Sequence, residues 1–565
     1  MLAKPRFKPH FHVEAAPDED VIYLLSEKGH HCLRGSLYRV LAPLLNGNHN
    51  VAEIVEILKL FTSEANIRNA LLRLEEQGYL VEAEEALPEA SAAFWGLHGI
   101  DAKLAKSRIS GSKVSLRAFG QVPQQSFVTH LKELGVQTDH ESDFVVALTD
   151  DYVQSGLREL NQECLQTKKF WLLVKPVGAV LWIGPLFVPG DTGCWQCLAH
   201  RLREHRKVES SLQYQLEISA PFPTSRAMLP STLQAGFSLA ATQVALALVQ
   251  PDLSPLQGVI VTIDAATLQM DRHILTKRPQ CPVCGIPSVD KPQPLQLQSR
   301  KKFFTEDGGH RICSPTETFK RYGHLVSSIT GVVGELKSVF SDANGLISIY
   351  SGTHRVLLTN KNFQQLQASL RNNSTGKGRS ALQSRASAFS EAIERYCAVY
   401  QGHEFRIRRP SRQMEEDFIP LEACMLFSEA QYDRREEWNH SHLAIEFVPV
   451  RLDPDKTIDW TPAWSLTSQR FKYVPTAYCY SQYRDPSDAE DPFYNVDSNG
   501  LAAGNVLEEA IVQGFFEVIE RDAVSIWWYN RLRRPCVDLD RFHDAYFDAL
   551  REYYASLGRE FWVLD

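Results

Sequence analysis

The sequence predicts a multidomain protein that combines α/β and α+β architecture. At 565 residues the chain is too long for one hydrophobic core. Short alternating runs followed by helical periodicity fill the first 85 residues, whereas strand and helix patterns alternate from about 90 to 290. A third segment, from about 300 to 565, carries two helical stretches with one shared polar signature. We therefore predict three domains, at 1–85, 90–290 and 300–565.

The first segment combines a small sheet with three helices. Strands are expected at 11–13, 21–25, 31–33 and 78–81, and helices at 37–45, 51–60 and 64–76. This order predicts a winged helix-turn-helix. Because residues 1–85 hold 9 Lys and Arg against 13 Asp and Glu, phosphate neutralisation on DNA is disfavoured. A peptide partner fits better, since a wing with an exposed strand edge accepts an extended peptide as an added strand.

The segment 90–290 predicts an α/β layer. Strands are expected at 114–119, 144–148, 170–174, 180–183 and 259–263, with a long helix of small residues at 233–249. The first strand is followed by a single glycine, Gly120, and by Pro123, so the glycine fingerprint of a dinucleotide site is missing. We do not expect nucleotide binding in this segment.

Two CxxC pairs stand apart from the other cysteines of the chain: Cys194 with Cys197, and Cys281 with Cys284. Cys281 opens a Cys-Pro-x-Cys-Gly knuckle, which is typical of tetrahedral thiolate zinc. Four sulfur ligands would close the shell and leave no position for a water nucleophile, so the predicted zinc is structural. A thioredoxin-type redox pair or a coincidence is the alternative reading of one pair, and the second pair weighs against it.

Two helical stretches repeat one signature: a polar residue, Glu four positions later, Glu three further on, then Arg. The copies are Ser387, Glu391, Glu394 and Arg395, and Gln513, Glu517, Glu520 and Arg521. Offsets of four and seven fall on one helix face, so four carboxylates can converge. Buried carboxylates repel one another unless cations neutralise them, and Mg²⁺ bridging carboxylates to ATP phosphates suits this set. A solvated, Arg-stabilised helix face explains one copy equally well, but explains two copies less well.

Asn505 and Glu509 extend the second stripe backwards at steps of four, after a turn-rich run at 498–504. The second helix is apolar around much of its circumference, at residues 515, 516, 518, 519 and 526–528, and we expect it to be buried. The run 376–378 before the first stripe predicts a small flexible turn, in which Lys377 is a solvated cation.

These residues resemble the YcaO-domain family, whose members use ATP to activate the amide oxygen of a peptide backbone. The resemblance covers roughly residues 300–565. It implies that Glu391, Glu394, Glu517 and Glu520 hold Mg²⁺ and nucleotide, that Ser387, Asn505, Glu509 and Gln513 position phosphates and ribose, and that Arg311 and Thr318 contact phosphates. Arg395 and Arg521 would neutralise charge that develops during phosphoryl transfer. Two alternatives stay open. In the first, each arginine only orients its own glutamates; in the second, Arg311 and Thr318 belong to an ordinary loop leading into a helix capped at Ser314.

The segment 90–290 resembles a degenerate ubiquitin-activating-type domain that keeps its zinc knuckles. The order of the three domains resembles the fused, cyanobactin-type heterocyclases of ribosomal peptide natural products. This resemblance implies an ATP-dependent cyclodehydratase whose precursor peptide docks its leader on the winged helix and has core cysteines cyclised to thiazolines. A YcaO domain continues past the strand expected at 560–565, so we expect this chain to be the N-terminal portion of a longer polypeptide.

Composition agrees with a cytoplasmic enzyme. The net charge is −8, no charged segment followed by an apolar stretch opens the chain, and the longest apolar run, at 177–188, is broken by Gly184 and Pro185. Neither nucleic acid nor a membrane is an expected partner. The alternatives are a YcaO enzyme that installs a thioamide or an amidine, a non-catalytic scaffold that delivers leader peptides, and an acidic winged-helix regulator. The sequence leaves open serine and threonine as substrates, the precursor, ADP or AMP as product, and a homodimer.

Overall fold

The computed structural model describes residues 2–17, 19–83, 87–251, 254–286, 292–305, 310–342, 345–354, 363–370, 373–442, 446–485 and 492–565. The chain divides into two compact units. The first comprises Met1–Leu148 and Leu229–Pro255, and the second comprises Thr149–Met228 and Leu256–Asp565. Both units take residues from the segment 90–290, and its predicted end at 290 lies outside the described residues, so the three-domain division stays a prediction.

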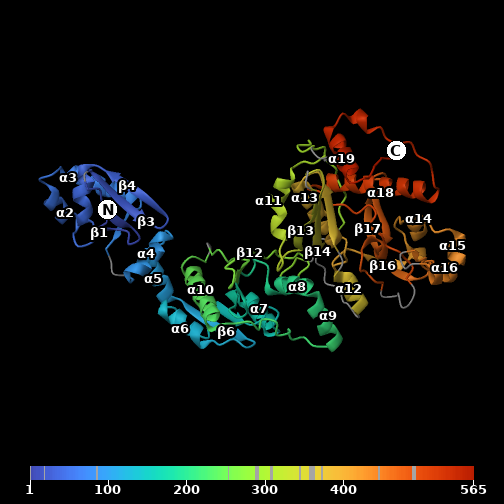
Figure 1. The fold of residues 1–565 in the computed structure, drawn as a ribbon. Helices are drawn as coiled ribbons and strands as arrows, with labels where there is room; N and C mark the ends of the chain where they lie inside the picture. Colours follow the sequence, from blue (N-terminus) through green and yellow to red (C-terminus); the bar gives the residue numbers. More distant parts are fainter. Residues whose placement is uncertain are drawn as a thin grey trace. The chain divides into compact units, whose positions relative to one another are not determined.

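The first unit opens with the winged-helix arrangement (Figure 1). Its elements are β1 (Pro5–Phe7), β2 (His12–Ala15), β3 (Val21–Ser26), β4 (Gly29–Arg34), α1 (Ser36–Leu41), α2 (Val51–Leu58), α3 (Glu64–Glu76) and β5 (Leu80–Glu82). Strands β2, β3 and β4 form an antiparallel wing, and β1 pairs with β5. Asn50 and Ser63 cap α2 and α3 by accepting hydrogen bonds from backbone N–H groups three residues on. The sequence located these helices but missed β1.

The rest of the first unit contains α4 (Glu89–Leu97), α5 (Ala102–Gly111), β6 (Lys113–Phe119), α6 (Gln125–Glu133), β7 (Gln137–Thr138), β8 (Phe144–Thr149) and α10 (Pro230–Val249). By length and composition, α10 is the one described helix that passes the test for a membrane span, and half of its apolar stretch is buried. A core helix of a soluble protein passes the same test.

The second unit begins with α7 (Gly156–Thr167), β9 (Phe170–Lys175), β10 (Val180–Phe187), α8 (Trp195–His205), α9 (Lys207–Leu216), β11 (Val259–Asp264) and β12 (Met270–Ile274). Strands β9 to β12 pair antiparallel with their neighbours in chain order. The predicted strands at 170–174, 180–183 and 259–263 are all present, and β12 was not predicted. This antiparallel run differs from an all-parallel nucleotide-binding sheet.

The next part of the second unit packs one long helix against a three-stranded sheet. It contains α11 (Pro315–Tyr322), β13 (Val333–Ser341), β14 (Ser348–His354), α12 (Phe363–Leu370), β15 (Ser374–Gly378) and α13 (Ala381–Cys397). A buried cluster of Val332, Val333, Phe389 and Ala392 joins α13 to the start of β13.

The run 376–378 lies in strand β15, so the predicted turn was wrong. A Cβ on Gly376 would lie 2.0 Å from the Ser384 carbonyl oxygen and 2.1 Å from the Ala388 nitrogen. Glycine is needed there because the strand backbone approaches the backbone of α13 directly, and no turn is involved.

A second three-stranded sheet and several short helices follow: β16 (Ile407–Pro410), α14 (Leu421–Met425), α15 (Glu429–Asp433), α16 (Arg435–Ser441), β17 (Thr457–Ser465), β18 (Arg470–Pro475) and α17 (Thr476–Cys479). Their core is centred on Trp460, Leu421, Ile458 and Phe493. The chain ends with α18 (Leu507–Tyr529) and α19 (Ala545–Ser556). At 560–565 the structure has only an isolated antiparallel bridge between Leu564 and Cys536 in place of the expected strand.

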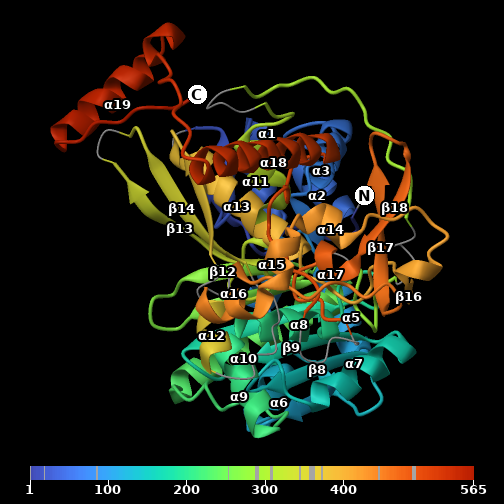
Figure 2. The ribbon, with the colours of Figure 1, turned by 90° about the vertical axis from the view of Figure 1, so that its right-hand side faces the viewer.

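The expected burial of α18 was wrong. Only Glu509 and Gly514 are buried on this helix, and Phe515, Phe516 and Trp528 are each more than 60% exposed. Figure 2 shows α18 lying along α11 and α13. Its polar stripe lines a cavity shared with these helices, and none of the described residues buries Phe515, Phe516 or Trp528.

Candidate ATP and magnesium site

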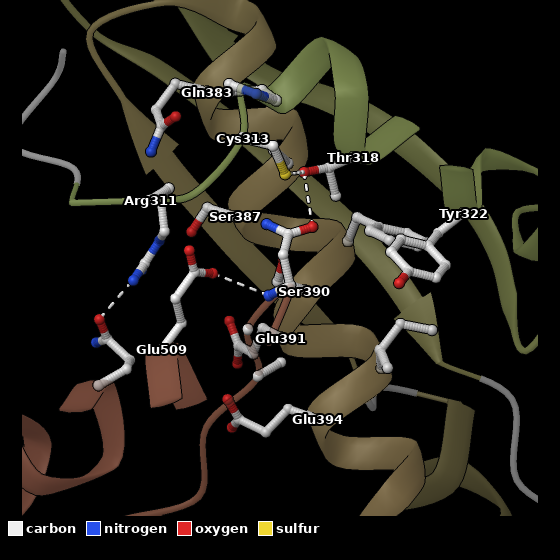
Figure 3. Close-up of a pocket in the computed structure, with 18 of the residues that line it drawn as sticks. Arg311, Cys313, Thr318, Tyr322, Gln383, Ser387, Ser390, Glu391, Glu394 and Glu509 are labelled. Atoms are coloured by element: carbon white, nitrogen blue, oxygen red, sulfur yellow. Dashed lines mark hydrogen bonds between the residues drawn. The ribbon is translucent and has the colours of Figure 1, made fainter. Parts of the chain in front are cut away.

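A cavity of about 720 Å³ lies within the second unit, among the segment before α11, helix α13 and helix α18. It is lined by all twelve residues that the sequence assigned to nucleotide and magnesium: Arg311, Thr318, Ser387, Glu391, Glu394, Arg395, Asn505, Glu509, Gln513, Glu517, Glu520 and Arg521. Segments about 190 residues apart in the chain therefore meet in one place. Figure 3 shows Glu391, Glu394 and Glu509 pointing into this common space.

Helix α13 supplies the first stripe. Glu391 accepts a hydrogen bond of 3.0 Å from the backbone N–H of Thr375, at the start of β15. Arg395 lies 3.6 Å from Glu391 and 3.8 Å from Glu394. These distances exceed hydrogen-bond length. The guanidinium therefore neutralises the carboxylates and leaves their oxygen atoms free to accept from, or bind, another group.

Helix α18 supplies the second stripe and repeats this geometry. Arg521 lies 3.6 Å from Glu517, one helical turn away. Glu520 lines the same cavity but is exposed, and Arg521 is more than half exposed. Each arginine lies beside the glutamates of its own helix, as it would if it only oriented them. Both arginines also line the cavity, where their N–H groups can bind an anion.

Glu509 organises the opposite wall. Its carboxylate accepts hydrogen bonds from the backbone N–H of Ile312, at 2.6 Å, and of Asn505, at 2.9 Å. Thr318 donates to the Asn505 side chain at 3.1 Å, and Arg311 donates to Gln513 at 3.3 Å. The buried Glu509 thus ties the start of α18 to the segment before α11, and Asn505 itself precedes the helix.

The helix expected after Ser314 is present as α11, and Ser314 caps it together with Glu317 in a capping box. This capped loop and the cavity wall are the same segment. The two interpretations of Arg311 and Thr318 are therefore compatible: the cap fixes the start of α11, and both Arg311 in the loop and Thr318 in the helix line the cavity.

The carboxylates of the two stripes repel one another when they are ionised. Burial raises the pKa of Glu394 to about 7, with Arg395 opposing the shift and Glu517 and Glu391 adding to it. Glu517 belongs to the other helix, so this repulsion acts across the cavity between the two stripes. A divalent cation would relieve it, which makes this cluster a candidate magnesium site.

Sequence reasoning missed several lining residues, among them Cys313, Tyr322, Gln383 and Ser390. Gln383 lies one helical turn before Ser387 on α13, so continuing the stripe backwards by four would have found it. Tyr322 and Cys313 carry no such periodic signal. Lys377, treated as a solvated cation, does not line the cavity.

The four-cysteine cluster also lies within the second unit. One ligand atom from each of Cys194, Cys197, Cys281 and Cys284 falls within 4.8 Å of every other. Cys194 caps the N-terminus of α8, and the knuckle brings its sulfurs within 3.7 Å and 3.5 Å of the first pair. The buried, all-sulfur donor set fits tetrahedral zinc.

The knuckle has the hydrogen bond and the glycine that such a site needs. The backbone N–H of Arg278 points at the Cys197 sulfur at 3.5 Å, which would stabilise a thiolate there. A Cβ on Gly285 would lie 2.2 Å from the Pro279 carbonyl oxygen, so the tight knuckle requires glycine.

Comparison with protein families gives two matches. A model of the YcaO family, described as a cyclodehydratase that binds ATP and Mg²⁺, matches residues 375–565. A winged helix-turn-helix model matches residues 6–82.

Two solved structures resemble the whole chain. A heterocyclase in complex with substrate and cofactor is 42% identical, with a TM-score of 0.90 over 99% of this chain and 76% of that one. The heterocyclase TruD is 39% identical, with a TM-score of 0.80 over 100% of this chain and 76% of that one.

Curated relatives match over shorter spans. An uncharacterized protein of Methanothermobacter thermautotrophicus is 31% identical over 192 residues, which is 34% of this chain and 43% of that protein. An uncharacterized protein of Mycobacterium tuberculosis is 24% identical over 218 residues, which is 39% of this chain and 42% of that protein. The matches thus span less than half the length of these relatives.

Proposed function

The chain belongs to the YcaO family of cyclodehydratases, and we propose that it is an ATP- and Mg²⁺-dependent peptide heterocyclase of the cyanobactin type. One observation carries the proposal: both Glu-x-x-Glu-Arg motifs and the Arg311 segment converge on one cavity. Its oxygen donors suit the metal ion of a nucleoside triphosphate, and its flanking guanidinium groups suit the phosphates.

Within this cavity we assign the residues by chemistry. Glu391, Glu394, Glu517 and Glu520 would hold Mg²⁺, which would offset their charge and that of the phosphates. Arg311 and Thr318 lie where they can reach phosphate oxygens, and Ser387, Asn505, Glu509 and Gln513 complete the polar wall. Arg395 and Arg521 would stabilise the charge that develops on the transferred phosphoryl group.

The reaction must remove an oxygen atom from an amide. A core cysteine thiol attacks the preceding carbonyl carbon, so a C–S bond forms and the thiol proton leaves. The resulting oxygen takes a phosphoryl group from ATP. The amide nitrogen then loses its proton, and a C=N bond forms as the C–O bond breaks and phosphate departs. Phosphate serves as the leaving group because expulsion of hydroxide is unfavourable in water. The product is a thiazoline, and serine or threonine would give an oxazoline.

We propose that the four cysteines hold a structural zinc, because their shell is closed and buried. The precursor peptide would dock its leader on the winged-helix segment at 6–82, as an added strand at the wing edge. We place the enzyme in the cytoplasm, where its peptide substrate is made. A homodimer remains compatible with this function.

A thioamide- or amidine-forming enzyme would share the ATP site and differ in its nucleophile. The solved heterocyclases that align with nearly the entire chain favour azoline formation over these products. A leader-binding scaffold without catalysis is disfavoured because the cavity retains both complete motifs.

The test is the intact mass of a leader-plus-core peptide with one core cysteine, incubated with the protein, ATP and Mg²⁺. We expect the loss of one water, and we expect less conversion when the leader is omitted. A core-alanine peptide is the matched control. A peptide of unchanged mass, with ATP bound to the protein, would contradict heterocyclase activity and favour another nucleophile.

A further inference from the structure

Helix α8 carries the first cysteine pair and, one turn further, a buried ion cluster. Arg201 donates to Glu204 at 2.9 Å, and His200 lies 3.1 Å from the same carboxylate. Both Arg201 and Glu204 are more than 90% buried. Because Cys197 and Arg201 are four residues apart, the sulfur and the guanidinium lie on neighbouring positions of one helix face.

This cluster contacts the helix that carries the first carboxylate stripe. Arg201 donates a 2.7 Å hydrogen bond to the Tyr396 hydroxyl, and its guanidinium lies 5.0 Å from the centre of the Tyr396 ring. Tyr396 is in the last turn of α13, two residues after Glu394 and one after Arg395. Its ring packs against the buried cluster beneath α13.

The segment that carries the second cysteine pair contacts α8 through Arg278. Burial raises the pKa of Tyr396, and the charges of Arg201 and Arg278 oppose the shift. Arg278 is the residue whose backbone N–H points at the Cys197 sulfur, three positions before Cys281. Arg201 of α8 therefore contacts Tyr396 directly, and the segment with the second cysteine pair contacts α8.

We propose that Tyr396 is a positioning residue that links the four-cysteine cluster to the ATP site. This inference rests on the proposed function. With zinc bound, α8 and the knuckle are fixed relative to each other, and so are Arg201 and Arg278. Arg201 holds Tyr396, which sets the rotation of the last turn of α13 and hence the direction of the Glu394 carboxylate.

A contact between α9 and α12 offers a matched control for the contact between α8 and α13. Lys207 of α9 donates to the Ser369 carbonyl oxygen of α12 at 2.9 Å. This contact is buried and has a basic side chain as its donor, as does the Arg201 contact, but α12 contributes no residue to the cavity. If any weakening of the packing between these helices affected the ATP site, losing either the Arg201 or the Lys207 contact should have the same effect. The proposed link predicts an effect only from the contact through Tyr396.

The experiment measures the dissociation constant of Mg²⁺-ATP, zinc content and leader-peptide affinity for four proteins: wild type, Tyr396→Phe, Arg201→Lys and Lys207→Met. Tyr396→Phe removes one hydroxyl and keeps the packed ring, so it should fold. We expect it to weaken Mg²⁺-ATP binding roughly three- to tenfold, with zinc content and leader affinity unchanged. Arg201→Lys should weaken it in the same direction, and Lys207→Met should leave it unchanged.

Zinc removal by a chelator supplies the coupling test. It should weaken Mg²⁺-ATP binding to the wild type and add little to the loss already present in Tyr396→Phe. Unchanged Mg²⁺-ATP affinity in Tyr396→Phe, an equal loss in Lys207→Met, or fully additive losses would overturn the link. If the wild type itself shows no Mg²⁺-dependent ATP binding, the proposed function fails and the link with it.

Discussion

Replacing Glu394 by glutamine should remove most of the pH dependence of Mg²⁺-ATP binding. Burial raises the pKa of the Glu394 carboxyl; with the opposing effect of Arg395 and the smaller contributions of Glu517 and Glu391 included, the value is about 7. A protonated carboxyl is a poor magnesium ligand, so protons and Mg²⁺ compete for this side chain. Glutamine has nearly the same size and does not titrate.

The size of the effect follows from that pKa. With a pKa of about 7, roughly 9% of Glu394 is ionised at pH 6 and roughly 91% at pH 8. If only the ionised form binds the metal, the association constant of Mg²⁺-ATP in the wild type rises about tenfold over this interval. Most of the gain falls within one pH unit of 7. Glu517→Gln should move the midpoint to lower pH, because it removes one repelling charge.

The assay is a titration of the protein with a fluorescent ATP analogue at fixed Mg²⁺, repeated from pH 6 to pH 8.5. ATP itself titrates in this range, but the ratio of wild type to Glu394→Gln cancels that contribution. We expect the ratio to rise with pH and to level off above about pH 8. A ratio that stays constant across the range would refute the assignment of Glu394 as a titrating metal ligand.

The same pKa sets the pH dependence of stability without metal. Because the pKa of Glu394 is higher in the folded than in the unfolded chain, its charge destabilises the fold as pH rises from about 4.5 to about 7. Below that window both states are protonated and the penalty is absent, and above it the penalty is complete. Thermal unfolding should show that this loss of stability is missing in Glu394→Gln and is offset in the wild type by Mg²⁺-ATP.

Three further changes have defined outcomes. Gly376→Ala should lower the free energy of unfolding by about 2–3 kcal/mol and weaken ATP binding, since the new Cβ meets the α13 backbone; Gly111→Ala, with open space around its Cβ, should be neutral in chemical denaturation. Glu391→Ala and Glu517→Ala should each abolish turnover in the peptide-mass assay with near-normal leader affinity, and an active variant would exclude the proposed ATP role. Cys281→Ser should lose zinc by elemental analysis and lower the melting temperature.

The spacing of residues along the chain was enough to predict which side chains share one face of a single helix. The offsets of four and seven placed Ser387, Glu391 and Glu394 on one face of α13, and the structure has them lining one cavity. The CxxC pairs were sufficient for the four-cysteine cluster, because each pair is a local unit with its own geometry.

Features that depend on what lies opposite an element were not predictable in this way. Periodicity showed that α18 is apolar on several sides, but it carries no information about what covers Phe515 or Trp528. The glycine at 376 was read as a turn residue, whereas its role is a close backbone approach between β15 and α13. The Arg201–Tyr396 contact joins residues 195 positions apart and has no local signature.

In the proposed reaction, the oxygen lost from the peptide leaves on a phosphoryl group supplied in the cavity that Glu391 and Glu517 line. Its most direct test uses a precursor peptide with ¹⁸O in the carbonyl that precedes a single core cysteine, incubated with the protein, ATP and Mg²⁺. Mass spectrometry of the phosphate-containing products should find one ¹⁸O atom for each thiazoline formed. Thiazoline formed with the label in water and none in any phosphate product would contradict the account.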